Sequence, residues 1–384
     1  MKHNNNLHLF WSDIVIESRL FKEAEYNINN SIFDNVYVLG NQKDGLPLED
    51  LHPSGFQIFR IKLIIDLTKS WKMSRIKIFR LFNIFLSLFQ YGLKSFSLTR
   101  HLKIKAISIH NLELLPLGVI IKLFFRIKLV YLPHELETEK SGSLPLLNLF
   151  YRFIEKFFII FADYTVTVSK PIEDWYRNNY SLKNIATIRN VPNLNQLNTD
   201  YDVEDLRKKF KISEDEPLYI YQGLLSSGRG ISLLTKTFEA AKKNIVFMGH
   251  GDLSLDIKNI KKKYINYLEP VKMEKICAQT SKADIGVHIN EDESLSYKFS
   301  LPNKFFEYIH SGIPIIVSPN MEYLAKIIDE NNLGWVVSPE NLEELIKKIN
   351  IKDCEILRTN IEKFAKEAIY ENDAKIFKNI YMTQ

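Results

Sequence analysis

Cysteine and long apolar runs are what this sequence most clearly lacks. Its 384 residues include only two cysteines, Cys277 and Cys354, which are too few for a disulfide framework and do not have metal-ligand spacing. A structural zinc site is therefore not expected, and a reducing compartment fits the composition. The start, MKHNNNLHLFWSDIVIE, has no apolar core of the signal-peptide type. No uncharged run reaches the ~20 residues that a membrane-spanning helix needs, so we expect no transmembrane segment.

Acidic residues are also scarce in the first half of the chain. Residues 1–193 carry 25 Lys and Arg against 17 Asp and Glu, a charge of +8, whereas residues 194–384 carry 26 against 29, a charge of −3. This asymmetry favours a negatively charged partner for the first half. Apolar residues make up 46% of the chain and charged residues 25%, which excludes a disordered protein, and the length suffices for two domains.

Short apolar strands alternate with helical segments along the chain. In the first half, strands are expected within residues 8–17, 35–41, 57–64, 106–110, 128–132 and 165–169. Such alternation predicts an α/β fold in which helices cover both faces of a parallel sheet. Ligands bind at the carboxyl ends of parallel strands, and His134 follows one of them. From the residues alone, His134 is either structural or a neutral imidazole that hydrogen-bonds a ligand.

The most informative stretch is SLPNKFFEYIHSGIPIIVS, residues 300–318. Pro302 suits the start of a helix, Gly312 suits its end, and the IPIIV run that follows is typical of a buried strand. Lys304 in the first turn adds a full charge to the free N–H groups of the helix start, which together favour a phosphate. Glu307 lies one turn further on the same face, where it can accept bonds from a ribose. The alternative is an ordinary surface Lys–Glu pair.

Two glycine-rich turns follow strands in the second half. In YQGLLSSGRG, the glycines at 223, 228 and 230 allow close backbone approach to a ligand, and Arg229 supplies a permanent cation. Gly249 and Gly251 flank His250 in a second turn. The D-x-D sequence at residues 200–202 precedes a helical segment, where acids cap the helix start, so we do not interpret it as a metal site.

The segment from Arg60 to Lys105 has 11 Lys and Arg and a single acid, Asp66. Bulky side chains at 71, 76, 79, 82 and 85 accompany Lys72, Arg75 and Lys77, as in a helix that lies in the headgroup region of an anionic membrane. A core helix with a solvated basic face would show the same pattern. No nucleic-acid recognition motif is present, so nucleic acid is not expected as a partner.

Several of these motifs, in this order, resemble the retaining glycosyltransferases of family 4, which have the GT-B fold. The stretch from Ser300 resembles the family's "SLPNK-x-FEY-x-x-x-G-x-P" after an "ADIG" strand, here residues 283–286. The passages QGLLSSGRG, IESRLFKEA, LVYLPHE and IRNVP are similar to further family motifs. Glu307 matches the second glutamate of the family's E-x7-E motif, but Phe299 occupies the place of the first. The glycine-rich first loop common in the superfamily is missing.

The resemblance implies two Rossmann-like domains that face a central cleft. These are an acceptor-binding domain at residues 1–193, a nucleotide-sugar-binding domain at 194–365, and a last helix at 366–384 that crosses back to the first domain. It implies catalytic roles for His134, Arg229 and Lys304. Glu135 and Glu137 are candidates for acceptor contacts or for helix capping. The residues expected to bind the donor are Gly223, Gly228, Arg229, Gly249, Gly251, Ser300, Leu301, Pro302, Asn303, Lys304 and Glu307.

The expected reaction is transfer of a sugar, with retention and without metal or cofactor, from a UDP- or GDP-sugar to a saccharide. By analogy, the acceptor is lipid-linked, in bacterial surface polysaccharide synthesis, and the enzyme is cytoplasmic, on the inner face of the plasma membrane. A sugar-nucleotide epimerase of the same fold is one alternative. A catalytically silent GT-B subunit is another, since it would tolerate Phe299 in place of the glutamate.

Overall fold

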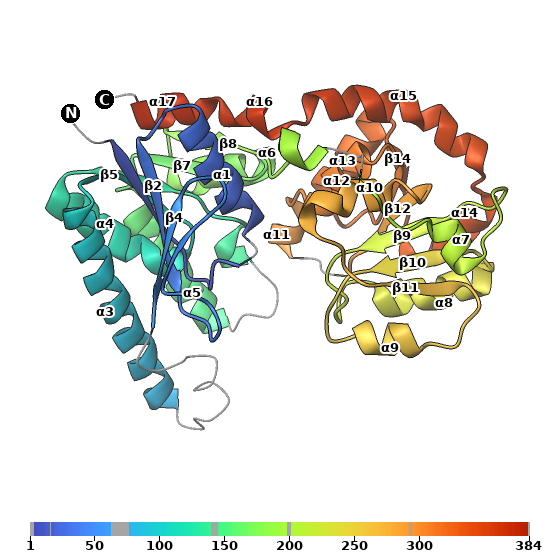
Figure 1. The fold of residues 1–384 in the computed structure, drawn as a ribbon, viewed down its shortest axis with the longest axis horizontal. Helices are drawn as coiled ribbons and strands as arrows, with labels where there is room; N and C mark the ends of the chain where they lie inside the picture. The colour runs from blue at the N-terminus through green and yellow to red at the C-terminus, as the bar shows by residue number, and fades with distance from the viewer. Residues whose placement is uncertain are drawn as a thin grey trace. The chain divides into compact units, whose positions relative to one another are not determined.

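The computed structural model describes residues 4–15, 17–62, 77–139, 145–197, 201–291 and 294–382. The chain divides into two compact units. The first comprises Met1–Thr138, Ser143–Ile188 and Ala374–Gln384, and the second comprises Glu139–Gly142 and Arg189–Asp373. Each unit contains one sheet with helices along both of its faces (Figure 1).

The first unit is built on an eight-stranded sheet of order β3-β4-β2-β1-β5-β6-β7-β8. All neighbouring strands pair in parallel except β3, which is antiparallel to β4. The strands are β1 (Asn5–Leu9), β2 (Asn35–Asn41), β3 (Glu49–Leu51), β4 (Gln57–Ile61), β5 (Ile104–Ile109), β6 (Lys128–Tyr131), β7 (Tyr164–Thr167) and β8 (Ile185–Thr187). The helices are α1 (Ser18–Asn29), α3 (Lys77–His101), α4 (Leu115–Phe125), α5 (Pro145–Ile159), α6 (Lys170–Tyr180) and α17 (Ile376–Met382).

The second unit is built on a six-stranded parallel sheet of order β11-β10-β9-β12-β13-β14. Its strands are β9 (Tyr219–Gln222), β10 (Ile245–Met248), β11 (Ile265–Leu268), β12 (Ile285–His288), β13 (Ile315–Val317) and β14 (Gly334–Val336). Its helices are α7 (Leu206–Phe210), α8 (Ile231–Ala241), α9 (Ser254–Asn259), α10 (Ile276–Thr280), α11 (Leu295–Lys298), α12 (Asn303–His310), α13 (Glu322–Asn331), α14 (Leu342–Lys348) and α15 (Ile351–Glu367). The short helix α16 (Tyr370–Ala374) ends where the chain returns to the first unit.

Most predicted strands are present, and the deviations have local causes. Strand β2 covers the predicted residues, but β1 begins at Asn5 rather than near His8. Asn5 and Asn6 have low strand propensity, yet both are buried, and Asn6 hydrogen-bonds Ser108. The sequence analysis also missed β3, whose three residues are all exposed and so carry no apolar alternation.

The cores consist of continuous apolar strands covered on both faces, as expected for parallel sheets. Strand β13 is fully buried, and the strands on either side of β9 contribute Phe247 and Val287 to the core of the second unit. Within the described part of the chain, no helix is both long and apolar enough to span a bilayer.

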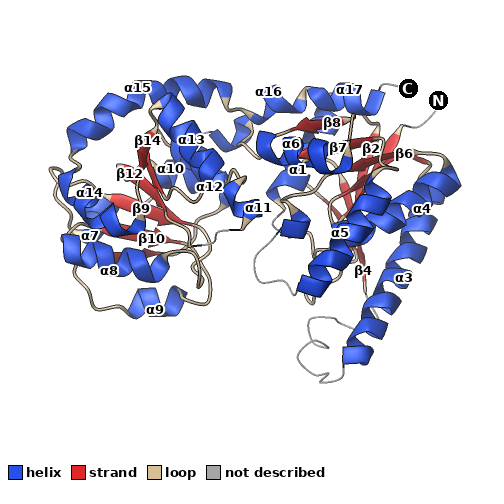
Figure 2. Cartoon of the chain, turned by 180° about the vertical axis from the view of Figure 1, so that it is seen from behind, coloured by secondary structure: helices blue, strands red, loops and turns tan. Residues whose placement is uncertain are grey.

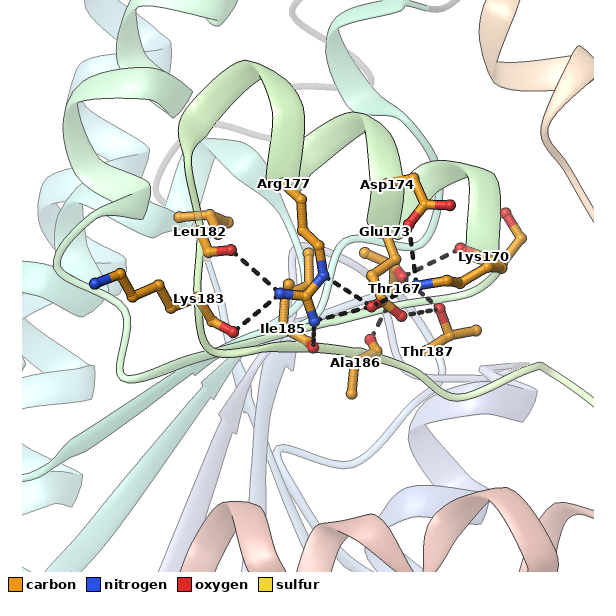
Figure 3. A network of polar contacts seen from close by, with 11 residues as sticks. Thr167, Lys170, Glu173, Asp174, Arg177, Leu182, Lys183, Ile185, Ala186 and Thr187 are labelled. Carbon is orange, nitrogen blue, oxygen red and sulfur yellow. Dashed lines mark hydrogen bonds and ion pairs between the residues drawn. The ribbon is translucent and has the colours of Figure 1, made fainter.

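A polar network fixes α6 to the edge of the first sheet (Figure 3). Glu173 on α6 accepts hydrogen bonds from Lys170, Arg177 and Thr187 at 2.9, 3.0 and 2.8 Å. The Arg177 guanidinium also donates to the backbone carbonyls of Leu182, Lys183 and Ile185. The network therefore closes the β7–α6–β8 connection.

Candidate functional site

The carboxyl ends of β9 and β12 mark the point where the second sheet changes direction. From β9 the chain proceeds through β10 to β11 on one side, and β12, β13 and β14 follow on the other side. Helices after β9 and β12 therefore leave the sheet in opposite directions, and the crevice at such a switch point is where α/β sheets bind ligands. The residues that follow these strands form the candidate site described next.

Lys304 is buried at this switch point. Its side chain comes from the first turn of α12, and only 8% of the residue is exposed. The ammonium nitrogen lies 4.2 Å from the ring centroid of Tyr221 and, among the described residues, has no hydrogen-bond partner. Burial, followed by the charge of Arg229, lowers the pKa of Lys304 to about 7, and Glu307 acts in the opposite direction. A buried ammonium group without a partner is costly unless an anion binds it.

Arg229 is half-buried in the loop between β9 and α8, and its charge acts on both Lys304 and Tyr221. The adjacent Gly230 caps α8 with a left-handed backbone, φ +72°. A Cβ at Gly230 would lie 2.6 Å from the carbonyl oxygen of Ile289, so this loop packs closely on the chain that leaves β12. The structure thus brings Arg229 and Lys304 together in one part of the second unit.

The predicted glycines allow two loops to pack backbone against backbone. A Cβ at Gly249 would lie 1.8 Å from the carbonyl oxygen of Gly223, and one at Gly251 would lie 2.2 Å from that of Leu225. A Cβ at Gly223 would lie 3.4 Å from Nζ of Lys304. Gly223 therefore lies beside the ammonium of Lys304, and Gly249 packs directly on Gly223. Gly228, in contrast, has nothing within 4 Å of its Cβ position.

Glu307 lies one turn after Lys304 and is half-buried. It accepts a hydrogen bond from the side-chain amide of Gln222, whose oxygen accepts one from Thr280 at 2.5 Å. The carboxylate is therefore oriented by β9 and α10 toward the same strand ends. This position is compatible with the predicted contact to a ribose, which stays a prediction.

The other predicted donor-site residues form the approach to α12. Pro302 caps the helix with an extended backbone, and Asn303 is exposed and accepts a hydrogen bond from Asn190 at 2.6 Å. Leu301 is buried, whereas the hydroxyl of Ser300 donates to the carbonyl of Tyr297 at 3.0 Å. Phe299 ends the short helix α11.

His288, the last residue of β12, is a candidate that the sequence analysis missed. It is 5% exposed, and both of its ring nitrogens lack a hydrogen-bond partner within the described ranges. Burial, followed by the charges of Lys304 and Arg229, holds its pKa well below the usual value, so the imidazole is neutral. The signal available in the sequence was its place at the end of a buried strand, which is also the place of His134.

In the first unit, His134 ends a chain of three histidines. His110 Nδ1 lies 3.1 Å from His134 Nε2, and His110 Nε2 lies 2.9 Å from His8 Nδ1. The ring of His134 stacks on Phe10, and buried Arg19 donates to the carbonyl of the preceding residue, Pro133. His110 follows β5 at the switch point of the first sheet, so His134 is held where a ligand of this unit would bind.

Among the described residues, one group of side chains could hold a metal ion, namely His8, Glu23 and His110. Their ligand atoms lie within 4.8 Å of one another, and all three residues are buried. Both ring nitrogens of His110 already contact other histidines, however, so ligation would break one of these contacts. Burial raises the pKa of Glu23 to about 7 and lowers that of His8 to about 3, which fits an uncharged polar cluster.

The predicted basic helix is only partly described. Trp71, Lys72, Arg75 and Ile76 lie outside the described residues, as do the side chains at 77, 79, 82 and 85. The described part of α3 packs on the first sheet through Tyr91, whose hydroxyl accepts a hydrogen bond from the backbone N–H of Phe10 at 3.1 Å. The rejected D-x-D motif is also incomplete, because residue 200 is not described.

The chain is similar to one protein-family model and to several solved structures. Residues 230–371 match the family model described as "Glucosyltransferase 3-like, C-terminal domain". Sucrose-phosphate synthase from Thermosynechococcus elongatus is 15% identical, with a TM-score of 0.71 over 99% of this chain and 98% of that one. Anabaena Alr3699/HepE, solved with UDP and glucose, is 12% identical, with a TM-score of 0.70 and complete coverage of both chains. No curated protein sequence matches.

The chain has the GT-B fold. At these identities the structural likeness establishes the fold alone, and it confirms the predicted pair of Rossmann-like domains. The matched family segment begins at Gly230 and contains the whole of α12, so it includes Lys304, Glu307 and His288. Family 4 membership is not established by these matches.

Proposed function

We propose that this GT-B protein is a glycosyltransferase that uses a nucleotide-diphosphate sugar as its donor. The observation that carries the proposal is the buried ammonium of Lys304, which has no hydrogen-bond partner within the described residues and lies near Arg229 at the start of α12. A diphosphate supplies the missing negative charge, and the free N–H groups of the helix start add further donors.

The chemistry follows from where charge develops during sugar transfer. As the bond between the sugar and the diphosphate breaks, negative charge accumulates on the leaving phosphate. Lys304 and Arg229 would stabilise that charge, and fixed charges of this kind are usually the largest catalytic contribution. Glu307 would hold the ribose. His288, neutral and buried beside both cations, can donate one hydrogen bond to a phosphate or sugar oxygen.

We further propose that the sugar is transferred with retention of configuration, without a metal ion, and from UDP or GDP. The resemblance to family 4 supports retention, and the two cations offer the charge that a metal would otherwise supply. UDP is the first nucleotide to test, since UDP is named for Alr3699/HepE and UDP-2-fluoro glucose for the trehalose-6-phosphate structure from E. coli, which has a TM-score of 0.68. His134 would support the reacting sugar from the first unit.

For the acceptor, we propose a lipid-linked saccharide of bacterial surface polysaccharide synthesis. The enzyme would then work at the inner face of the plasma membrane. The charge of +8 on residues 1–193 supports attraction to anionic lipid. Because Phe299 stands at the place of the glutamate in family 4, a catalytically silent GT-B subunit is the alternative function. Release of sugar from UDP-glucose without an acceptor would exclude that alternative.

Calorimetric titration with UDP, GDP and their sugars tests the donor site. We expect Lys304→Ala to weaken diphosphate binding by about tenfold or more, because a charge-assisted contact in a buried site is lost. His288→Ala should weaken it less. Lys326→Ala, on the exposed face of α13, is the matched control and should bind as the wild type does. If no nucleotide diphosphate binds at millimolar concentration, the proposal is wrong.

A further inference from the structure

The outer faces of α4 and α5 carry an unusual set of exposed apolar side chains. The two helices pack against each other in the first unit, beside α3 (Figure 2). Their exposed large apolar residues range from 53% to 72% in exposure. Monomeric soluble proteins rarely display a continuous apolar surface of this kind without a partner. We call it the α4–α5 face, and it comprises Ile120, Leu123, Phe124, Leu149, Phe150, Phe153, Phe157 and Ile160.

The spacing of these residues groups them along each helix. On α5 the apolar positions recur every three or four residues, so they form one stripe along the helix. The rings of Phe153 and Phe157 stack with centroids 6.3 Å apart. The ring centroids of Phe124 on α4 and Phe96 on α3 lie 5.6 Å apart, so the apolar surface extends toward α3. The inward side of α5 is used separately for packing, since Ile159 is fully buried.

The exposed charges of α4 and α5 are predominantly positive. Arg126, Arg152 and Lys156 are exposed, and α4 itself contains no acidic residue. Of the acids nearby, Asp163 is paired with Lys122 of α4 at 2.6 Å, and Glu113 accepts a hydrogen bond from Tyr151 of α5. The one acid of α5, Glu155, is buried on the inward side, where Tyr131, Tyr176 and Tyr180 donate hydrogen bonds to it at 3.0, 2.6 and 3.0 Å. Exposed cations beside aromatic and aliphatic bulk complement an anionic lipid surface. In a symmetric contact with a second copy, the same cations would come together.

We propose that the α4–α5 face docks on an anionic bilayer and inserts its phenylalanines below the lipid headgroups. This inference deepens the proposed function, because it names the surface that would hold the enzyme beside a lipid-linked acceptor. It also moves the main membrane contact from the basic segment at residues 60–105 to α4 and α5. The attachment is then partly apolar rather than purely electrostatic.

Vesicle sedimentation with the full chain tests the proposal. The wild type should bind vesicles of phosphatidylcholine with phosphatidylglycerol, more weakly those of phosphatidylcholine alone, and should retain part of its binding at high salt, because screening weakens only the charged contacts. Phe153→Glu with Phe157→Glu should reduce binding by about tenfold or more. Ile356→Glu is the matched control, since Ile356 is an exposed apolar residue on α15 of the other unit, and should leave binding unchanged.

Nucleotide titration of the same variants separates this inference from the proposed function. Loss of vesicle binding with intact UDP binding supports the α4–α5 face and shows that the double variant is folded. If neither wild type nor variant binds UDP, but vesicle binding behaves as expected, the donor proposal alone fails. Unchanged vesicle binding in the double variant overturns the inference. So does a dimer, detected by sedimentation velocity, that the double variant dissociates without any change in vesicle binding.

Discussion

The burial of Lys304 opposes the stability of the free protein. Its pKa is 10.5 in the unfolded chain and about 7 in the folded one, so the unfolded state binds more protons between these values. Stability therefore rises with pH across this interval, and the cost of burying the ammonium is fully present below about pH 7. An anion bound at the site, as proposed, would remove that cost.

We therefore expect Lys304→Met to stabilise the nucleotide-free protein while weakening diphosphate binding by about tenfold or more. The gain in unfolding free energy should be on the order of a few kcal/mol at about pH 6 and close to zero at about pH 10. Urea unfolding at the two pH values measures it. Lys326→Met, at an exposed position on α13, should show no such pH-dependent gain. A destabilised Lys304→Met protein at the lower pH would contradict this account of the burial.

At the scale of elements, the loops after β9 and β10 depend on direct backbone contact. Gly249→Ala places a Cβ within 1.8 Å of the carbonyl oxygen of Gly223, and neither backbone can move without disturbing its strand. We expect a loss of about 3 kcal/mol or more in unfolding free energy. The Cβ of Gly228→Ala would contact no atom, so only the left-handed backbone, φ +79°, disfavours this substitution. We expect it to lower the unfolding free energy by about 1–2 kcal/mol. Equal losses in urea unfolding would refute the proposed close contact.

For the whole molecule, the C-terminal residues matter because they complete the first unit. The hydroxyl of Tyr381 on α17 lies 2.8 Å from that of Ser108 and donates to Glu23 at 3.0 Å. Lys128 donates to the carbonyl of Ile380 at 3.0 Å. Phe377 and Ile380 of α17 are buried as well. Helix α17 therefore contributes both polar and apolar contacts to the first unit.

A chain that ends at Asp373 should therefore have a destabilised first unit. We expect its calorimetric unfolding transition to shift to much lower temperature, because buried side chains are removed and Glu23 loses a partner. Tyr381→Phe, which removes only the hydroxyl, should cost about 1 kcal/mol. The transition of the second unit should stay where it is. An unchanged first transition in the shortened chain would mean that α17 contributes no stability.

The sequence by itself determined the elements whose ends are marked by local chemistry. Helix α12 spans Asn303–His310 as predicted, between Pro302 and Gly312, because proline and glycine restrict the backbone regardless of what surrounds it. The α/β class followed from the alternation of strands and helices, since each such pattern must bury its apolar side. The same kind of local pattern predicted Lys304 and Arg229 as donor-site residues, and their role stays a prediction.

Only the tertiary structure decided what lies beside what. Strand order places His288 at the switch point and His110 against His134, and it leaves Lys304 buried without a partner in the described part of the chain. The amphipathic pattern of α5 could not indicate that the apolar stripe faces outward, because the inward side is apolar as well and includes Ile159. Burial and pairing depend on residues far away in the chain, whereas propensity and capping act over a few neighbours, and that difference in range separates what could be predicted from what could not.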